Sequence, residues 1–402
     1  MKIRVAPGSL LLAVFAIFMF MPAYFSNEIT KLILNILFVG TMIFLFKHSY
    51  KPTGFVWSVF AYIFYLIVIS FIEKTPTADI HLIITHVKML AFLGLMEYEL
   101  KKNYSATVRI LFVILLVYVM MDFASILLFP RGMYFASTSW NEWSSSVQAQ
   151  WLYGNKNNRI QWYVMLILLA CMRQMTKKGL GFQLSSFFIL IVSVIYPLLV
   201  DSMTSWGVML IIATGMIWGL FFKSEKKPRI NTYIVYGGYV ILLGLVITGA
   251  ATFLRPLVEG VFGRDMTFTD RMTIWIETIK HIGQKPIFGW GIFSGEGSAE
   301  ILGSAAFTSA HNQLLHTLWQ GGVVGLLLLI IIFIVLAQQL NKKKSRNLHL
   351  FLNFVVFAIF IEMIFESILG AYAMWYALLL CYHFQDLPAE NANTGAGRTL
   401  SE

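Results

Sequence analysis

The chain has 402 residues, of which 58% are apolar and only 12% are charged, whereas ordinary soluble domains carry about a quarter charged residues. This composition excludes a soluble globular protein and predicts an all-α polytopic membrane protein. The formal net charge of +10 would suit a nucleic-acid-binding protein, but the distribution of the cations along the chain gives a different explanation and predicts no nucleic-acid partner.

Apolar stretches long enough to cross a bilayer recur along the chain, since a spanning helix needs about 20 mostly apolar residues. About twelve transmembrane helices are predicted, at residues 8–25, 30–47, 54–73, 80–99, 107–129, 158–175, 182–200, 203–222, 232–254, 312–339, 349–365 and 370–386. They form a single polytopic membrane domain over residues 1–386. Residues 387–402 are predicted to be a disordered cytoplasmic tail.

The lysines and arginines gather in alternate loops. One set of loops and termini holds most of the 30 cations, among them Lys2, Lys47, Lys101 and Lys342. The positive-inside rule places this set, and therefore both termini, in the cytoplasm. The long loops at residues 130–157 and 255–311 then face outward, where neither ATP nor a nucleotide sugar is available. Any reaction on that side needs an energised substrate that arrives through the membrane.

The longest polar segment, residues 255–311 between the ninth and tenth spans, is predicted to be an outward-facing catalytic loop that contains short helices. Apolar residues from Met272 to Ile279 recur at the spacing of an amphipathic helix, and Thr267 followed by Asp270 matches a capping box. Arg271 then lies in the first helical turn, where a cation is unfavourable unless an anion such as phosphate binds there. The simpler alternative is a solvated charge or a salt bridge to a neighbouring acidic residue.

His311 lies where this loop re-enters the membrane. An imidazole titrates near neutrality and can accept a proton from a sugar hydroxyl. The adjacent Asn312 is a candidate for orienting the ring or binding the acceptor. His316 falls on a different helix face and is predicted to pack or to hydrogen-bond, and the pair Gly321 and Gly325 favours close approach of two helices.

Ionisable residues within predicted spans are costly and often functional. Lys88, Asp201, Glu362 and Glu366 lie in the outer halves or at the outer ends of spans, where they could line one cavity, although ion pairing inside the bundle is the simpler interpretation of each. The same residues leave a secondary transporter open, but no pair of broken helices in matching halves is evident. No P-loop, His-Glu-x-x-His or paired-aspartate motif occurs, so a mechanism without a metal or cofactor is predicted.

Three motifs together resemble the O-antigen polymerase and O-antigen ligase superfamily, which includes the Wzy-type polymerases. They are Arg271-x-x-x-Trp275, Pro286-x-x-Gly289-x-Gly291 and His311-Asn312-x9-Gly322-x-x-Gly325, and the turn Gly154-Asn155-Lys156-Asn157 is similar to an asparagine-containing turn in that family. The likeness in topology covers most of the chain. The likeness in motifs is confined to the insert.

The resemblance implies a metal-independent, inverting glycosyltransferase of the GT-C type in the bacterial plasma (inner) membrane, with its active site facing the periplasm or the exterior. Its donor would be an oligosaccharide on undecaprenyl pyrophosphate and its acceptor a second glycan. Membrane lipids and a chain-length regulator would be further partners. Arg271 would hold the pyrophosphate and His311 would act as the base.

One departure concerns the phosphate site. Many family members carry an arginine after Thr or Ser at the outer start of a span, but here residues 202–206 contain none. Cations elsewhere are candidates to replace it, and the full set of candidate substrate-binding residues is Arg264, Asn312, Lys88, Arg159, Lys156, Glu366 and Trp275.

The identity of the acceptor separates two activities within the family. A polymerase uses a second carrier-linked repeat unit, which would build O-antigen, capsule or exopolysaccharide. A ligase transfers the glycan to lipid A-core or to another acceptor. The polymerase is favoured because no additional acceptor-binding domain is present, and the ligase stays open.

Overall fold

The structure is a computed structural model that describes residues 6–75, 80–137, 147–157, 159–178, 183–221, 227–247, 269–303, 309–370 and 372–385. Its helical bundle contains α1 (Pro7–Met19), α2 (Glu28–Lys47), α3 (Gly54–Ile72), α4 (Ile80–Lys102), α5 (Tyr104–Leu128), α6 (Ile160–Lys178), α7 (Leu184–Leu199), α8 (Met203–Met216), α9 (Thr232–Ile247), α13 (Gln313–Asn341), α14 (Arg346–Phe365) and α15 (Tyr372–His383). Each predicted span corresponds to one of these helices. The predicted tail lies outside the described residues.

Within the described residues, six helices are long and apolar enough to cross a membrane. They are α2, α3, α5, α13, α14 and α8 together with the π-helical turn Ile217–Phe221 that continues it. Helices α1, α7 and α9 are shorter apolar helices. The chain is thus a mostly helical, multi-pass membrane protein, while the count of about twelve crossings and the cytoplasmic location of both termini remain predictions.

Local sequence signals set several helix ends. Helix α1 ends at Met19, before the predicted boundary, because Pro22 interrupts the backbone and a single 3-10 turn follows at Ala23–Phe25. Helix α2 begins with a capping box in which the Asn27 side chain accepts from the Thr30 amide. The chain therefore turns back into the bundle through a short, well-defined corner.

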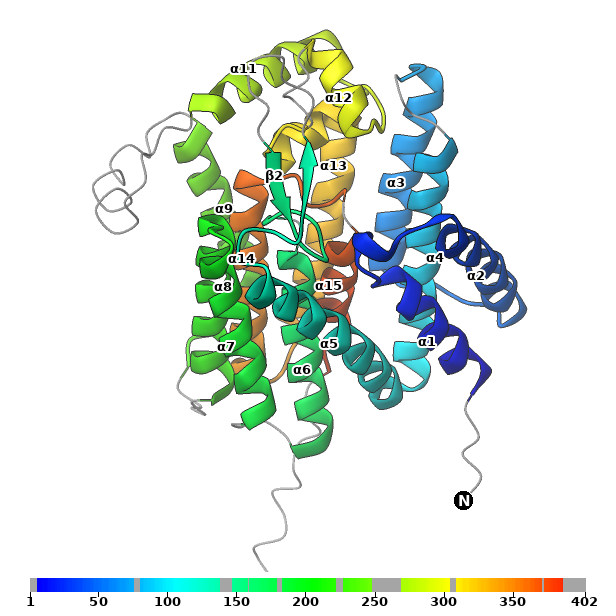
Figure 1. Ribbon diagram of the computed structural model, residues 1–402, viewed down its shortest axis with the longest axis vertical. Coiled ribbons are helices and arrows are strands. Elements are labelled where there is room, and N and C mark those ends of the chain that lie inside the picture. The colour runs from blue at the N-terminus through cyan, green and yellow to red at the C-terminus, as the bar shows by residue number, and fades with distance from the viewer. Residues whose placement is uncertain are drawn as a thin grey trace, which may run out of the picture.

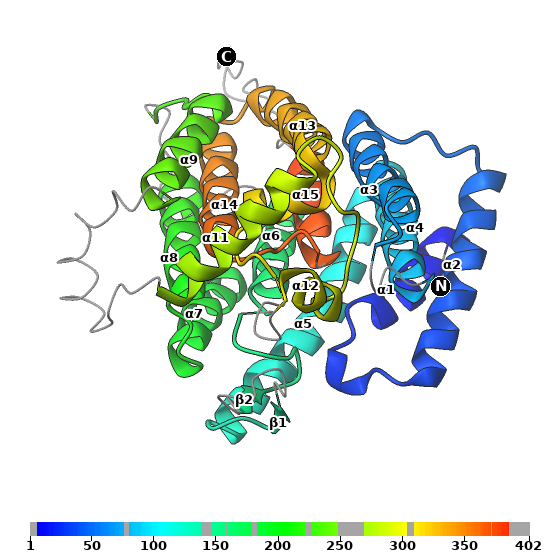
Figure 2. The ribbon, with the colours of Figure 1, turned by 90° about the horizontal axis from the view of Figure 1, so that it is seen from above.

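Burial differs strongly between the helices. In α14, 78% of the most apolar stretch is buried, whereas in α2 the corresponding share is 11%. Helix α14 packs on α8, α9 and α13, and α15 packs on α4 and α6. Figure 2 shows α14 and α15 inside the bundle and α2 at its edge. The candidate catalytic groups lie at the end of the deeply buried helix α14.

The insert helices and the short strands lie toward one end of the bundle (Figure 1). Helices α11 (Thr269–Gln284) and α12 (Gly295–Leu302) lie between α9 and α13 in sequence, and α11 crosses over the end of the bundle (Figure 2). Strands β1 (Tyr134–Ser137) and β2 (Val147–Gln150) form an antiparallel hairpin, with Tyr134 opposite Gln150. The sequence predicted the short helices of the insert but not the hairpin.

Candidate active site

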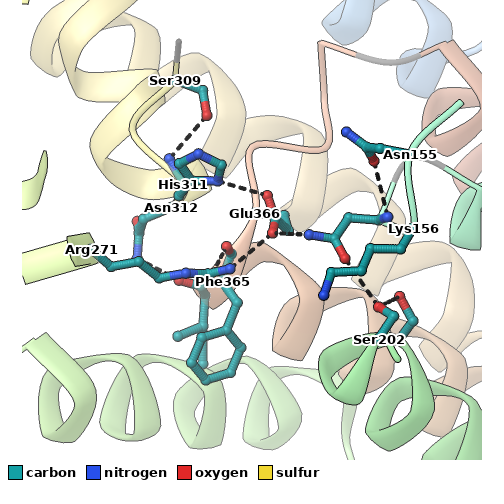
Figure 3. A network of polar contacts seen from close by, with 12 residues as sticks. Asn155, Lys156, Ser202, Arg271, Ser309, His311, Asn312, Phe365 and Glu366 are labelled. Atoms are coloured by element: carbon teal, nitrogen blue, oxygen red, sulfur yellow. Dashed lines mark hydrogen bonds and ion pairs between the residues drawn. The ribbon is translucent and has the colours of Figure 1, made fainter. Parts of the chain in front are cut away.

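The carboxylate of Glu366 links the two residues that the sequence singled out. Its Oε2 lies 3.0 Å from the Nδ1 of His311, and its Oε1 lies 3.0 Å from the Nη2 of Arg271 (Figure 3). Glu366 is the first residue after α14, and its backbone N–H still donates to the Glu362 carbonyl. The end of a rigid, buried helix therefore fixes the position of the carboxylate.

Arg271 reaches this carboxylate from the first turn of α11, as the sequence predicted. Its Nη1 donates to the Phe365 carbonyl, and its guanidinium carbon lies 5.9 Å from the centre of the Phe365 ring. A guanidinium has five N–H donors, and the described contacts to Phe365 and Glu366 use two of them. The side chain is 27% exposed, so the remaining donors can reach an anion.

The backbone holds His311 in a strained conformation. Its φ is 44°, in the left-handed region that side-chain-bearing residues rarely adopt and that costs of order 1–3 kcal/mol. The next residue, Asn312, fixes this geometry because its buried side chain caps α13 by accepting from the Leu315 amide. The strain aims the imidazole at Glu366.

The proton position on His311 follows from its neighbours. A carboxylate can only accept, so we assign the proton to Nδ1, which donates to Glu366. The Nε2 is then the basic nitrogen, and it has no hydrogen-bond partner within the described part of the chain. The side chain is 31% exposed. This arrangement of imidazole and carboxylate is that of a general base with an orienting acid.

A polar turn completes the cluster. The Asn157 amide donates to Glu366 Oε1 at 2.8 Å, and its Oδ1 accepts from Ser202 at 3.0 Å. Lys156 donates to the Asp201 carbonyl at 3.0 Å, at the turn between α7 and α8. Lys156 thus lies beside residues 202–206, where many family members carry an arginine. Figure 3 shows this turn on the side of Glu366 that is away from His311 and Arg271.

Burial and charge act in opposite directions on Glu366. Burial alone raises the pKa of this carboxyl, but the hydrogen bonds from His311 and Arg271 and the charge of Arg271 outweigh burial and lower the pKa below its ordinary value. Glu366 is therefore ionised at neutral pH. A lowered pKa contributes stability that is complete above the unfolded-state pKa and is lost as the pH falls through the folded-state pKa.

This gives a prediction for Glu366→Gln. At about pH 7 the variant should unfold at a lower temperature than the wild type, because the amide cannot hold Arg271 and His311 as a carboxylate does. Below the ordinary carboxyl pKa of 4.5 the difference should shrink with falling pH. Thermal unfolding of both proteins in detergent at several pH values tests this. A difference that stays constant down to about pH 3 would show that folding does not lower the pKa of Glu366.

The other candidate substrate-binding residues do not all join the cluster. Arg159 is completely buried, pairs with Asp122 at 3.9 Å and lies 4.8 Å from the Trp151 ring. Its guanidinium makes its contacts inside the bundle, because its acidic partner Asp122 lies on α5 and is also buried. Asn312 is equally buried and serves as a helix cap. Neither side chain is therefore proposed to bind substrate.

Of three further candidate residues, one is buried in the core, one is not bonded to the cluster and one lies outside the described residues. Trp275, one turn after Arg271, is buried and anchors α11 to the core. No hydrogen bond or ion pair of the described residues joins Lys88, on α4, to Glu366 or its neighbours. Arg264, like the capping box predicted at Thr267, lies outside the described residues. Lys156 is next in sequence to Asn157, which bonds Glu366 directly.

The glycine motifs hold the insert against the membrane helices. Gly322 interrupts α13 with a φ of 59°, and the backbone groups that leave the helical pattern there pair with the turn after α11. Val323 donates to the Pro286 carbonyl at 2.9 Å, and Gly291 donates to the Gln320 carbonyl at 2.8 Å. Non-helical backbone at this depth is satisfied by protein partners rather than by lipid. The motif from Pro286 to Gly291 and the glycine motif of α13, which are separate in the sequence, thus pair with each other. We call this contact between the insert and α13 the joint.

Gly321 and Gly325 have the role that the sequence predicted. A Cβ on Gly321 would meet Leu66 at 3.0 Å, and one on Gly325 would meet Tyr65 at 3.6 Å, both on α3. His316 packs against the rings of Phe293 and Trp319. These residues serve the packing of α13.

Gly322→Ala should disrupt the joint. A Cβ at this position would lie 2.3 Å from the Ile287 carbonyl oxygen, and alanine is strained at a positive φ, so we expect a loss of at least about 2 kcal/mol. The matched control is Gly283→Ala on α11, where nothing lies within 4 Å. Thermal unfolding in detergent measures both variants. Equal unfolding temperatures would show that the joint does not stabilise the fold.

Residues 159–330 match the O-antigen ligase family (Wzy_C). The match includes Arg271, His311 and the glycine motifs. This match supports the resemblance of the chain to the O-antigen ligase and polymerase superfamily. No curated protein sequence matches the chain.

The O-antigen ligase match ends before Glu366, which is the hub of the cluster in space. Sequence reasoning named Glu366 as a substrate-binding candidate but not as the residue that bonds both Arg271 and His311. It missed Ser202 and the Phe365 carbonyl, and it found Asn157 only as part of a family turn. Among the described residues, no group of three or more His, Cys, Asp or Glu could hold a metal ion, and metal independence remains a prediction.

Proposed function

We propose that the protein is a glycosyltransferase that polymerises oligosaccharide repeat units carried on undecaprenyl pyrophosphate, at the outer face of the plasma membrane. The single observation that carries this proposal is the Glu366 carboxylate, which bonds an arginine on one oxygen and a histidine on the other. An anion-binding group and a base thus meet at one partly exposed position. The match to a family named for O-antigen transfer supports an enzyme over the transporter alternative.

In the proposed reaction the diphosphate of the donor binds to Arg271. His311 Nε2 accepts the proton of an acceptor hydroxyl while the oxygen attacks the anomeric carbon from the opposite face. The new C–O bond forms as the bond to the phosphate oxygen breaks, so the configuration inverts and undecaprenyl pyrophosphate leaves. Arg271 stabilises the charge that grows on the leaving group, and ionised Glu366 stabilises the imidazolium that forms.

Lys156 is proposed as the second cation for the diphosphate, because it lies at the α7–α8 turn beside the cluster. Lys156→Gln should raise the KM for the donor roughly tenfold, the effect of losing one charge-assisted hydrogen bond, with a smaller change in kcat. The control is Lys280→Gln, an exposed lysine of α11 that pairs with Glu277. Unchanged donor kinetics in Lys156→Gln would remove this residue from the site.

The activity is tested with purified protein and a carrier-linked repeat unit. The proposal expects release of undecaprenyl pyrophosphate together with a doubled glycan that remains on carrier. A transporter would move the substrate between leaflets without releasing free carrier. Absence of release under conditions in which the donor binds would contradict the transferase proposal.

The second candidate is an O-antigen ligase, favoured by the description of the matched family. Polymerase and ligase differ in the acceptor, which the cluster of Arg271, Glu366 and His311 does not select. Deleting the gene distinguishes them. Single repeat units attached to the cell surface indicate a polymerase, which would then work with a chain-length regulator, whereas long chains stranded on carrier indicate a ligase.

A further inference from the structure

A groove lies between α2 and α3, away from the Arg271–Glu366–His311 cluster. Its volume is about 700 Å³, and α4 forms its floor through Leu90, Ala91 and Gly94. Figure 2 shows α2 standing apart from α3, with α4 between them. The groove is open because α2 packs on α1 and α4 and leaves the face of α3 uncovered.

The walls of the groove are apolar along most of their length. On α3, Trp57, Phe60 and Phe64 form a ladder, with Phe60 stacked on Phe64 at 5.8 Å between ring centres. The floor includes small residues. Space beside Gly94 is tight, because a Cβ there would lie 3.2 Å from the Tyr50 ring. A groove with aromatic side chains along its wall and aliphatic or small residues along its floor can accommodate an extended hydrocarbon chain.

One end of the groove is polar and positively charged. Lys47, the last residue of α2, lines this end together with Ser49 and Tyr50. Lys47 is exposed, and it has no acidic partner among the described residues. The hydroxyl of Tyr50 is bonded to the buried carboxylate of Glu97, which holds this end in place. The groove therefore offers a free ammonium at the mouth of an apolar channel.

The length and orientation of the groove indicate what fills it. From Val56 to Ile67 the lining of α3 rises by about 16 Å at 1.5 Å per residue, close to half of the roughly 30 Å hydrocarbon core. The groove thus extends through one leaflet, from the lysine-rich end that is predicted to be cytoplasmic. The carrier diphosphate of the proposed reaction binds at the opposite end of the bundle.

We propose that this groove binds an anionic phospholipid of the cytoplasmic leaflet. Its phosphate pairs with Lys47, and one acyl chain lies along the aromatic ladder of α3. The charge at Lys47 selects an anionic over a zwitterionic headgroup, and the length of the channel selects a chain that spans one leaflet. This site is independent of the glycosyltransferase proposal, so either can fail alone.

Native mass spectrometry of the purified full chain tests the headgroup. Titration with phosphatidylglycerol and with phosphatidylethanolamine of the same acyl chains should show about fivefold tighter binding of the anionic lipid, the preference expected from one lysine near an anionic phosphate. Lys47→Gln should abolish the preference. The matched control is Lys31→Gln at the other end of α2, where Lys31 pairs with Glu28, and it should keep the preference.

A second pair of variants tests the channel. Ala91→Phe fills the floor and should lower the binding of both lipids at least fivefold, whereas Ala61→Phe, at an exposed position of α3 outside the groove, should not. Equal binding of the two lipids by the wild type, or an unchanged preference in Lys47→Gln, would overturn the proposal. Displacement of phosphatidylglycerol by undecaprenyl phosphate would reassign the groove to the carrier lipid, and a lipid-free dimer would reassign it to a second copy.

Discussion

Replacing His311 by alanine should lower the rate of glycan transfer by at least about 100-fold, the lower end of the contribution that a positioned general base makes. The imidazole Nε2 has no hydrogen-bond partner among the described residues, whereas Glu366 is already bonded to Arg271 and Asn157. No other described side chain of the cluster is a neutral base. The acceptor hydroxyl would then have to attack without losing its proton.

The measurement is the initial rate of undecaprenyl pyrophosphate release by purified protein at saturating donor. His48→Ala is the matched control, because His48 is exposed and bonds to the Phe44 carbonyl at the opposite end of the bundle. His311→Ala should bind donor and unfold near the wild-type temperature. A variant that transfers glycan at the wild-type rate would exclude His311 as the base.

Arg271→Lys should reduce kcat/KM for the donor by about 100-fold or more, although the charge is kept. The guanidinium uses one nitrogen for the Phe365 carbonyl and another for Glu366, and it presents its remaining donors in a fixed plane. A lysine is a point charge that cannot hold Glu366 and a phosphate together. Removal of one preorganised donor to developing charge costs about 10²–10³ in rate.

Donor titrations and single-turnover rates separate the two parts of this loss. Arg131→Lys, at an exposed arginine between α5 and β1, serves as the control. Retention of more than half of the wild-type kcat/KM in Arg271→Lys would show that the several fixed N–H donors of the guanidinium are not needed. A loss confined to KM would assign Arg271 to ground-state binding of the diphosphate.

The sequence predicted the helices well because a membrane imposes a fixed length on apolar stretches. The tenth span, for example, was expected at 312–339, and α13 spans Gln313–Asn341. It also placed Arg271 in the first turn of an amphipathic helix and His311 at the start of a span. These features are local, and each is set by a short stretch of residues.

What the sequence could not supply was pairing between distant segments. Asp122 neutralises Arg159 from another helix, so a buried structural arginine resembled a candidate phosphate ligand. The hairpin of β1 and β2 is only four residue pairs long, which is too short for an alternating pattern to stand out in the sequence. The break at Gly322 depends on the incoming turn at Ile287, and nothing within α13 itself distinguishes this glycine from Gly321.

Helix α11 is secured unequally at its two ends. At its C-terminal end, Lys285 pairs with Glu73, and the Trp290 indole donates to the His281 carbonyl at 3.0 Å. At its N-terminal end, Arg271 donates to the Phe365 carbonyl and to the Glu366 carboxylate. A diphosphate that draws the guanidinium away from Glu366 would therefore remove polar contacts from the first turn of α11 alone. Trp275 would keep the rest of the helix on the core, so substrate binding can rearrange Arg271 without moving the base.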